Sequence, residues 1–128
     1  MTRTHHTPVA ATSSTIRGVR AAAALSVLVL LSQFLSAGQI LVGKEALDWH
    51  GAGAIALHVT TALLLAATVL HGRRTRVWWP AALAALVFVL GFVQAALGSA
   101  GSIATHVPVA LVLTVGIVWL AAWSFRAP

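Results

Sequence analysis

Three stretches of this chain carry no Lys, Arg, Asp or Glu, and each is long enough to cross a lipid bilayer. They run from 21 to 43, from 49 to 72 and from 77 to 125. A membrane-spanning helix needs about 20 predominantly apolar residues, so the first two stretches predict one helix each. The third is roughly twice as long as one span requires, and a Gly/Ser-rich cluster at 98–102 favours a turn near its middle. The pattern predicts four membrane-spanning helices.

The composition agrees with a membrane protein and leaves little room for anything else. The chain is 59% hydrophobic and 8% charged, whereas soluble domains average about 25% charged residues. We expect helices over about 18–42, 50–71, 77–98 and 102–125. They predict an all-α, up-down-up-down four-helix bundle in a single domain, 18–126. Residues 1–17, rich in Thr, Ser and His, are expected to form a flexible cytoplasmic tail.

The formal net charge of +6 indicates an orientation in the membrane rather than a nucleic-acid partner. Seven of the eight basic residues lie before the first uncharged stretch, in the second connection or after the last helix, and only Lys44 lies elsewhere. The positive-inside rule then places both termini in the cytoplasm and the Lys44 connection outside. We expect a multi-pass protein of a bacterial plasma membrane whose first partner is the lipid bilayer, with arginines near anionic headgroups.

Two histidines, His58 and His106, lie within the predicted spans, both in the outer half. An ionisable side chain at membrane depth is costly, so it suggests a functional site. The residues that share a helix face with His58 include Gly51, Ala54 and Thr61, all small. Small side chains allow close helix packing and also leave a slot for a flat ligand.

A shared haem b explains both histidines, because neutral imidazoles on two helices of a bundle are good ligands for haem iron. We therefore expect His58 and His106 to be the metal ligands. Zinc fits less well, because a tetrahedral site needs more ligands and no Cys, Asp or Glu lies at that depth. An imidazole satisfied by a neighbouring helix is the alternative without a cofactor.

The depth of the two histidines leaves one choice open. His58 and His106 differ by roughly 7 Å in expected depth, so the shallower His50 competes with His58, although we expect His50 at the edge of the haem. Gln94 on the third helix either bonds to another helix or donates to the ligand. His71 is expected to face solvent, as are His5 and His6 in the tail.

Two short sequences resemble the haem A synthase family. The residues at 92–98, Phe-Val-Gln-Ala-Ala-Leu-Gly, resemble its Gln-x-x-Leu-Gly type sequence before the last hairpin, and Leu47-Asp48-Trp49 is similar to the Asp-Trp that ends its first outer loop. The family consists of four-helix halves whose second and fourth helices carry haem-ligating histidines. The resemblance implies that this chain looks like one such half, with His58 and His106 in those places.

The chain also departs from that family. There a catalytic Glu stands three residues before the second-helix histidine and an Arg follows it, whereas here Ile55 and Val59 occupy these positions. We expect haem binding with one-electron transfer or haem handling, and not the oxidation reaction. One alternative is a cofactor-free accessory or assembly subunit of a larger membrane complex. Another is a half-size enzyme acting as a homodimer, which would need Glu45 or Asp48 near the haem edge.

Overall fold

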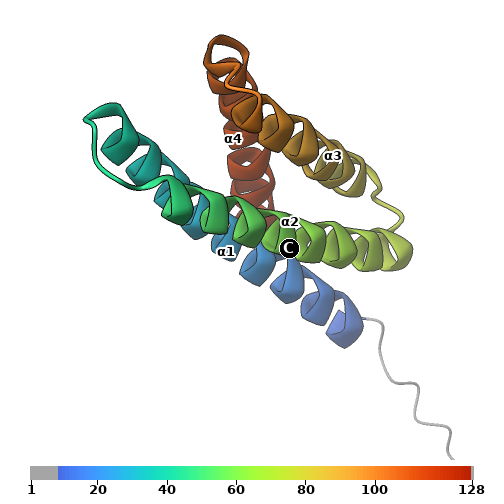
Figure 1. Cartoon of the computed structure of the whole chain (residues 1–128). Coiled ribbons are helices and arrows are strands. Elements are labelled where there is room, and N and C mark those ends of the chain that lie inside the picture. Colours follow the sequence, from blue (N-terminus) through green and yellow to red (C-terminus); the bar gives the residue numbers. More distant parts are fainter. Residues whose placement is uncertain (1–8, 128) are drawn as a thin grey trace, which may run out of the picture.

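The protein is helical almost throughout. The computed structural model describes residues 9–127, with side chains from Ser14 onward. Its helices, in chain order, are α1 (Val9–Leu41), α2 (Leu47–Thr75), α3 (Trp79–Ser99) and α4 (Ile103–Arg126) (Figure 1). Over the described range there is no strand, and all four helices are long and apolar enough to cross a membrane. These observations confirm the predicted all-α class and its four apolar helices.

Helix α1 begins well before the predicted boundary at residue 18. It starts at Val9, so half of the segment expected to be a flexible tail is helical, while residues 1–8 lie outside the described range. The 33 residues of α1 correspond to about 50 Å, which exceeds a hydrocarbon core of about 30 Å. Ile16 and Val19 are 2% and 0% exposed. Their burial against the other helices stabilises the early turns of α1.

All three connections contain a residue with a left-handed backbone. In the connection after α2 this residue is Arg76, with φ +64°, and in the other two it is a glycine. Gly43, in the connection after α1, has φ +78°, and Gly101, in the connection after α3, has φ +70°. Glycine adopts this conformation without steric cost and commonly ends helices. The amide of Gly101 donates to the carbonyl of Gly98 at 3.0 Å. The predicted turn in the third apolar stretch is thereby confirmed.

Each helix contacts its neighbours in the chain, and α4 returns to contact α1. A first apolar cluster draws on all four helices and consists of Ile16, Val19, Ala22, Ala23, Leu64, Ala84 and Leu120. A second, nearer the middle of the helices, consists of Leu30, Val87, Leu113 and Ile117. Many large apolar side chains remain exposed on the outside, which is the surface that lipid would cover.

Packing is uneven along α3 and α4. Val87 and Leu113 are buried, yet no residue from Phe88 to Val112 is. We call the part of the bundle around this stretch the His106 end. It contains His106 on α4 and His50 on α2. In Figure 1 the α1–α2 and α3–α4 connections lie apart from each other. The bundle is therefore held together mainly away from the His106 end.

The opposite region, the Arg20 end, is closed by polar contacts. The Arg20 guanidinium on α1 donates from Nε to the carbonyl of Ser124 and from Nη2 to that of Ala127, each at 2.8 Å. Ser124 lies in the last turn of α4 and Ala127 directly follows that helix, where carbonyls lack intrahelical partners. Arg20 thus joins the first helix to the last.

His71, expected to face solvent, is buried at the Arg20 end with 5% of its surface exposed. Its Nδ1 lies 3.2 Å from the Thr15 hydroxyl, and the edge of Trp123 packs against the ring at 5.7 Å between ring centres. The expectation was wrong because it started the first helix too late in the chain, at residue 18, to include Thr15. The early turns of α1 cover His71.

Candidate functional site

His50 and His106 occupy equivalent positions on two helices that do not follow one another in the chain. Each is the fourth residue of its helix, α2 for His50 and α4 for His106. Their ring centres are 6.3 Å apart, with an angle of 54° between the ring planes. Both side chains are half-buried. The loosely packed end therefore brings two imidazoles close together across the bundle, with their planes tilted to each other.

The His106 ring is held by α3. Its Nδ1 lies 3.0 Å from the backbone carbonyl of Gln94. A carbonyl oxygen can only accept, so Nδ1 carries the proton and Nε2 of the neutral ring keeps its lone pair. The ring lies over Gly98, where an added Cβ would stand 3.0 Å from Cε1. The absence of a side chain at Gly98 makes this position possible.

The His50 ring is held by α1. Its Nδ1 lies 2.9 Å from the hydroxyl oxygen of Ser36, and that hydroxyl donates to the backbone carbonyl of Gln33 at 3.0 Å. Because the single hydroxyl proton points to Gln33, the oxygen accepts from His50, and Nδ1 is again the protonated nitrogen. The hydrogen bonds of both rings thus engage Nδ1, and the His50 ring also interacts with the Gln33 backbone.

His58 points elsewhere. Its Nδ1 donates to the carbonyl of Ala54 on its own helix at 2.8 Å, and its ring centre is 4.5 Å from that of Phe92 on α3. A Cβ added at Gly91 would lie 3.2 Å from Nε2 of His58. Gly91 is seven residues from Gly98, or about 10 Å along α3. The structure therefore brings His106 to His50 rather than to His58.

Three buried polar atoms have no hydrogen-bond partner within the described part of the chain: Nε2 of Gln33, Nε2 of His58 and Oε1 of Gln94. A buried polar group left unpaired costs about 1 to 3 kcal/mol. The Gln33 amide packs over Gly53 of α2, and the Gln94 backbone holds His106. Unpaired buried atoms of this kind, here on one histidine and two glutamines, are often found at a functional site.

The small residues predicted around His58 do not converge on one ligand. Gly51 is exposed, and an added Cβ there would meet nothing within 4 Å. The Thr61 hydroxyl donates to the carbonyl of Leu57 at 2.8 Å, within α2. Glu45 and Asp48, the acidic groups available outside, are both exposed. Of the residues predicted for the site, the structure brings together His106 and the backbone of Gln94. His50 lies next to His106.

The donor set fits a haem better than a bare metal ion. Among the described residues no three His, Cys, Asp or Glu side chains form a possible metal site, and tetrahedral zinc needs about that many. A porphyrin supplies its own in-plane nitrogens and asks the protein only for axial ligands. Two imidazoles bound through Nε2 to opposite sides of one metal would have ring centres about 6.2 Å apart, given metal–nitrogen distances of about 2.0 Å.

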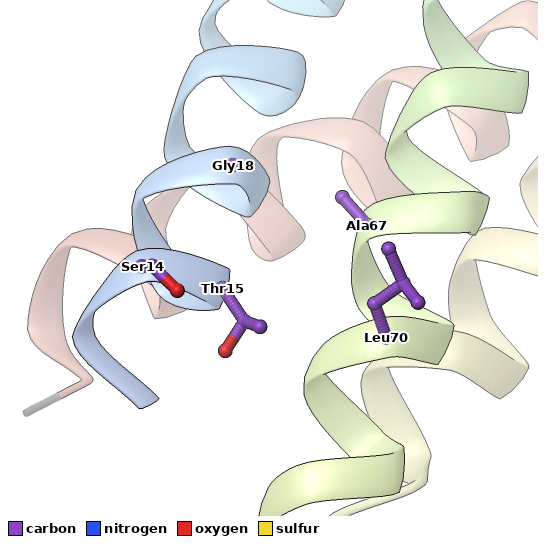
Figure 2. A pocket seen from close by; sticks show the side chains of 5 residues that line it. All are labelled: Ser14, Thr15, Gly18, Ala67 and Leu70. Carbon is purple, nitrogen blue, oxygen red and sulfur yellow. The ribbon is translucent and has the colours of Figure 1, made fainter. Parts of the chain in front are cut away.

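A separate hollow lies between α1 and α2 at the Arg20 end, away from His50 and His106. Figure 2 shows the side chains that line it: Ser14, Thr15, Gly18, Ala67 and Leu70. This lining offers methyl groups and two hydroxyls but no imidazole or carboxylate. The hollow therefore does not extend the histidine site.

Sequence reasoning missed Ser36 and Gly53 as parts of the site. Ser36 is fully buried and stands five residues before the end of α1, while His50 stands three after the start of α2. Ser36 and His50 thus lie at similar distances from the connection between α1 and α2, and this spacing was the signal in the sequence that could have indicated their contact. No protein-family model, no curated protein and no solved structure matches this chain, so its function has to be inferred from the geometry of the histidines.

Proposed function

We propose that this chain is a haem-b-binding integral membrane protein in which His50 and His106 are the axial ligands. The observation that carries the proposal is the 6.3 Å between the two ring centres. In both rings Nδ1 is engaged by a neighbouring helix, so both Nε2 atoms are available to a metal. His50 takes the place that the sequence first suggested for His58.

The residues of the site would act by holding and orienting the two imidazoles. Haem iron between two histidines supplies one-electron transfer. The Gln94 carbonyl and the Ser36 hydroxyl fix the tautomer and orientation of the rings, as second partners of metal-bound histidines commonly do. The loose packing from Phe88 to Val112 favours a bulky group between the helices, and exposed Glu45 and Asp48 offer no buried acid for the family's oxidation.

The proposed orientation is up-down-up-down, with both termini in the cytoplasm of a bacterial cell. Support comes from the basic residues, since Arg73 and Arg74 are exposed near the end of α2 and Lys44 is the single basic residue of the other connections. Trp49, Trp78 and Trp79 are exposed near helix ends, which suits anchors at the membrane surface. The histidine pair would then lie near the outer face of the membrane.

Absorption spectroscopy of the protein extracted from membranes tests the proposal. We expect a Soret band and, after reduction, sharp α and β bands from low-spin haem. The double variant His50→Ala, His106→Ala should lose them. A double variant of His5 and His6 to alanine removes as many imidazoles and should keep them. Full haem loading in the first double variant would refute the assignment.

A second candidate is a cofactor-free accessory subunit. It is favoured by the absence of buried residues between Phe88 and Val112, because a partner's helix could fill that region as well as a haem could. Such a protein would be colourless when purified and would co-purify with its complex. The same spectrum therefore decides between the two candidates.

A further inference from the structure

We propose that Ser36 is a positioning residue that sets the proton on His50 and thereby tunes the redox potential of the site. This inference rests on the proposed function for one of its readouts. It starts from an asymmetry between the two rings. His106 is held by a backbone carbonyl, which every residue possesses, whereas His50 is held by the side chain of Ser36 and also interacts with the Gln33 backbone.

The hydrogen bonds run in one direction from α2 into α1. Nδ1 of His50 donates to Ser36 over 2.9 Å, and Ser36 donates to the Gln33 carbonyl over 3.0 Å. Ser36 is 0% exposed, so water does not compete for its oxygen. In a membrane-embedded setting an unpaired N–H is costly. The hydroxyl therefore favours the Nδ1-protonated ring over the other tautomer, and leaves Nε2 as the free lone pair.

Donation from Nδ1 also changes what Nε2 offers to a metal. A histidine that donates its other N–H to an acceptor becomes a more basic ligand. A more basic axial ligand stabilises the oxidised iron and lowers the potential. Loss of the acceptor should therefore shift the midpoint potential upward. The shift should be absent when a serine elsewhere in α1 is changed.

Ser26 is the matched control. It is also 0% exposed and also lies on α1, but its hydroxyl donates to the Ala22 carbonyl of its own helix at 2.9 Å and touches no histidine. It lies ten residues from Ser36, about 15 Å along the helix. Ser36→Ala and Ser26→Ala thus delete the same group at the same burial.

The test compares the midpoint potentials of the wild type, Ser36→Ala and Ser26→Ala. We expect an upward shift in Ser36→Ala and no shift in Ser26→Ala. Ser36→Cys keeps the volume and offers a weaker acceptor, so its potential should fall between those of wild type and Ser36→Ala. If Ser36→Ala does not accumulate, the midpoint potential of Ser36→Cys alone tests the role of Ser36. An unchanged potential in a haem-loaded Ser36 variant would overturn the inference and leave the proposed function intact.

A second readout separates the two proposals. NMR spectra of the purified, reduced protein labelled with ¹⁵N-histidine report which nitrogen of His50 carries the proton. They also report whether that proton is hydrogen-bonded. We expect an Nδ1 proton that loses its hydrogen-bond shift in Ser36→Ala only. If no sample binds haem, the proposed function fails, and this spectrum alone decides the role of Ser36. An Nδ1 signal that is the same in Ser36→Ala as in wild type would refute that role.

Discussion

The ring of His106 lies over the backbone of Gly98, at a distance that would crowd a methyl group. A Cβ at Gly98 would stand 3.0 Å from Cε1 and 3.1 Å from Nδ1 of the ring. Nδ1 is the atom that donates to Gln94. The glycine therefore controls both where the ring sits and whether it keeps its hydrogen bond.

Gly98→Ala should displace His106 and weaken haem binding about tenfold, or about 1.4 kcal/mol. The helix itself should not suffer, because alanine is favoured over glycine in a helix by about 0.5 to 1 kcal/mol. Haem titration of the purified variant measures the effect. Gly51→Ala is the control, since nothing lies within 4 Å of its added Cβ. Equal affinities of the two variants would contradict this account of Gly98.

The roles of His50 and His58 can be separated by single variants. His50→Ala should convert the spectrum from low spin to high spin or abolish it, because it removes one of the two proposed axial imidazoles. His58→Ala should keep the low-spin spectrum, since its ring packs against Phe92 and its Nδ1 bonds within α2. Absorption and EPR spectra of both variants provide the measurement. The opposite result would return the ligand role to His58, as first expected from the sequence.

Arg20→Lys should lower the thermal stability of the bundle. Arg20 makes two charge-assisted hydrogen bonds to Ser124 and Ala127, each worth about 1.5 to 3 kcal/mol, and a lysine cannot reproduce the planar fork. We expect a loss of about 1 to 3 kcal/mol, seen by circular dichroism in detergent. Arg73→Lys, at an exposed position, should have little effect, and both variants should keep their haem spectra.

The orientation can be read with single cysteines, because the chain has none of its own. Lys44→Cys should react with a membrane-impermeant maleimide added to intact cells. Arg74→Cys should react only after the inner membrane is permeabilised. Both positions are exposed, so access is set by the side of the membrane alone. Labelling of position 74 in intact cells would reverse the proposed topology.

The helices were predictable because charge is excluded from the hydrocarbon core, so uncharged stretches mark the spans directly. The depth of each histidine was less predictable, since it depends on where a helix begins. The second helix was expected to start at residue 50 and starts at Leu47. Those three residues make His50 the fourth residue of its helix, level with His106, and leave His58 deeper.

Contacts between side chains of different helices could not be read from the sequence. Helix periodicity gives the face on which Gly51 or Thr61 lies, but the rotation and tilt of a helix decide what that face meets. Gly51 meets nothing within 4 Å, whereas Gly53, on the same helix, receives the Gln33 amide. A change of helix rotation would exchange such roles without altering any local pattern.

The two hydrogen bonds that Arg20 makes to the end of α4 also imply an order of assembly during synthesis. Arg20 is made early, while its acceptors lie 104 and 107 residues later in the chain. During synthesis the Arg20 guanidinium therefore stays without these two acceptors until the ribosome has added the last turn of α4 and Ala127. A chain truncated before Ser124 would lack both acceptors, so Arg20 could not join α1 to the end of α4.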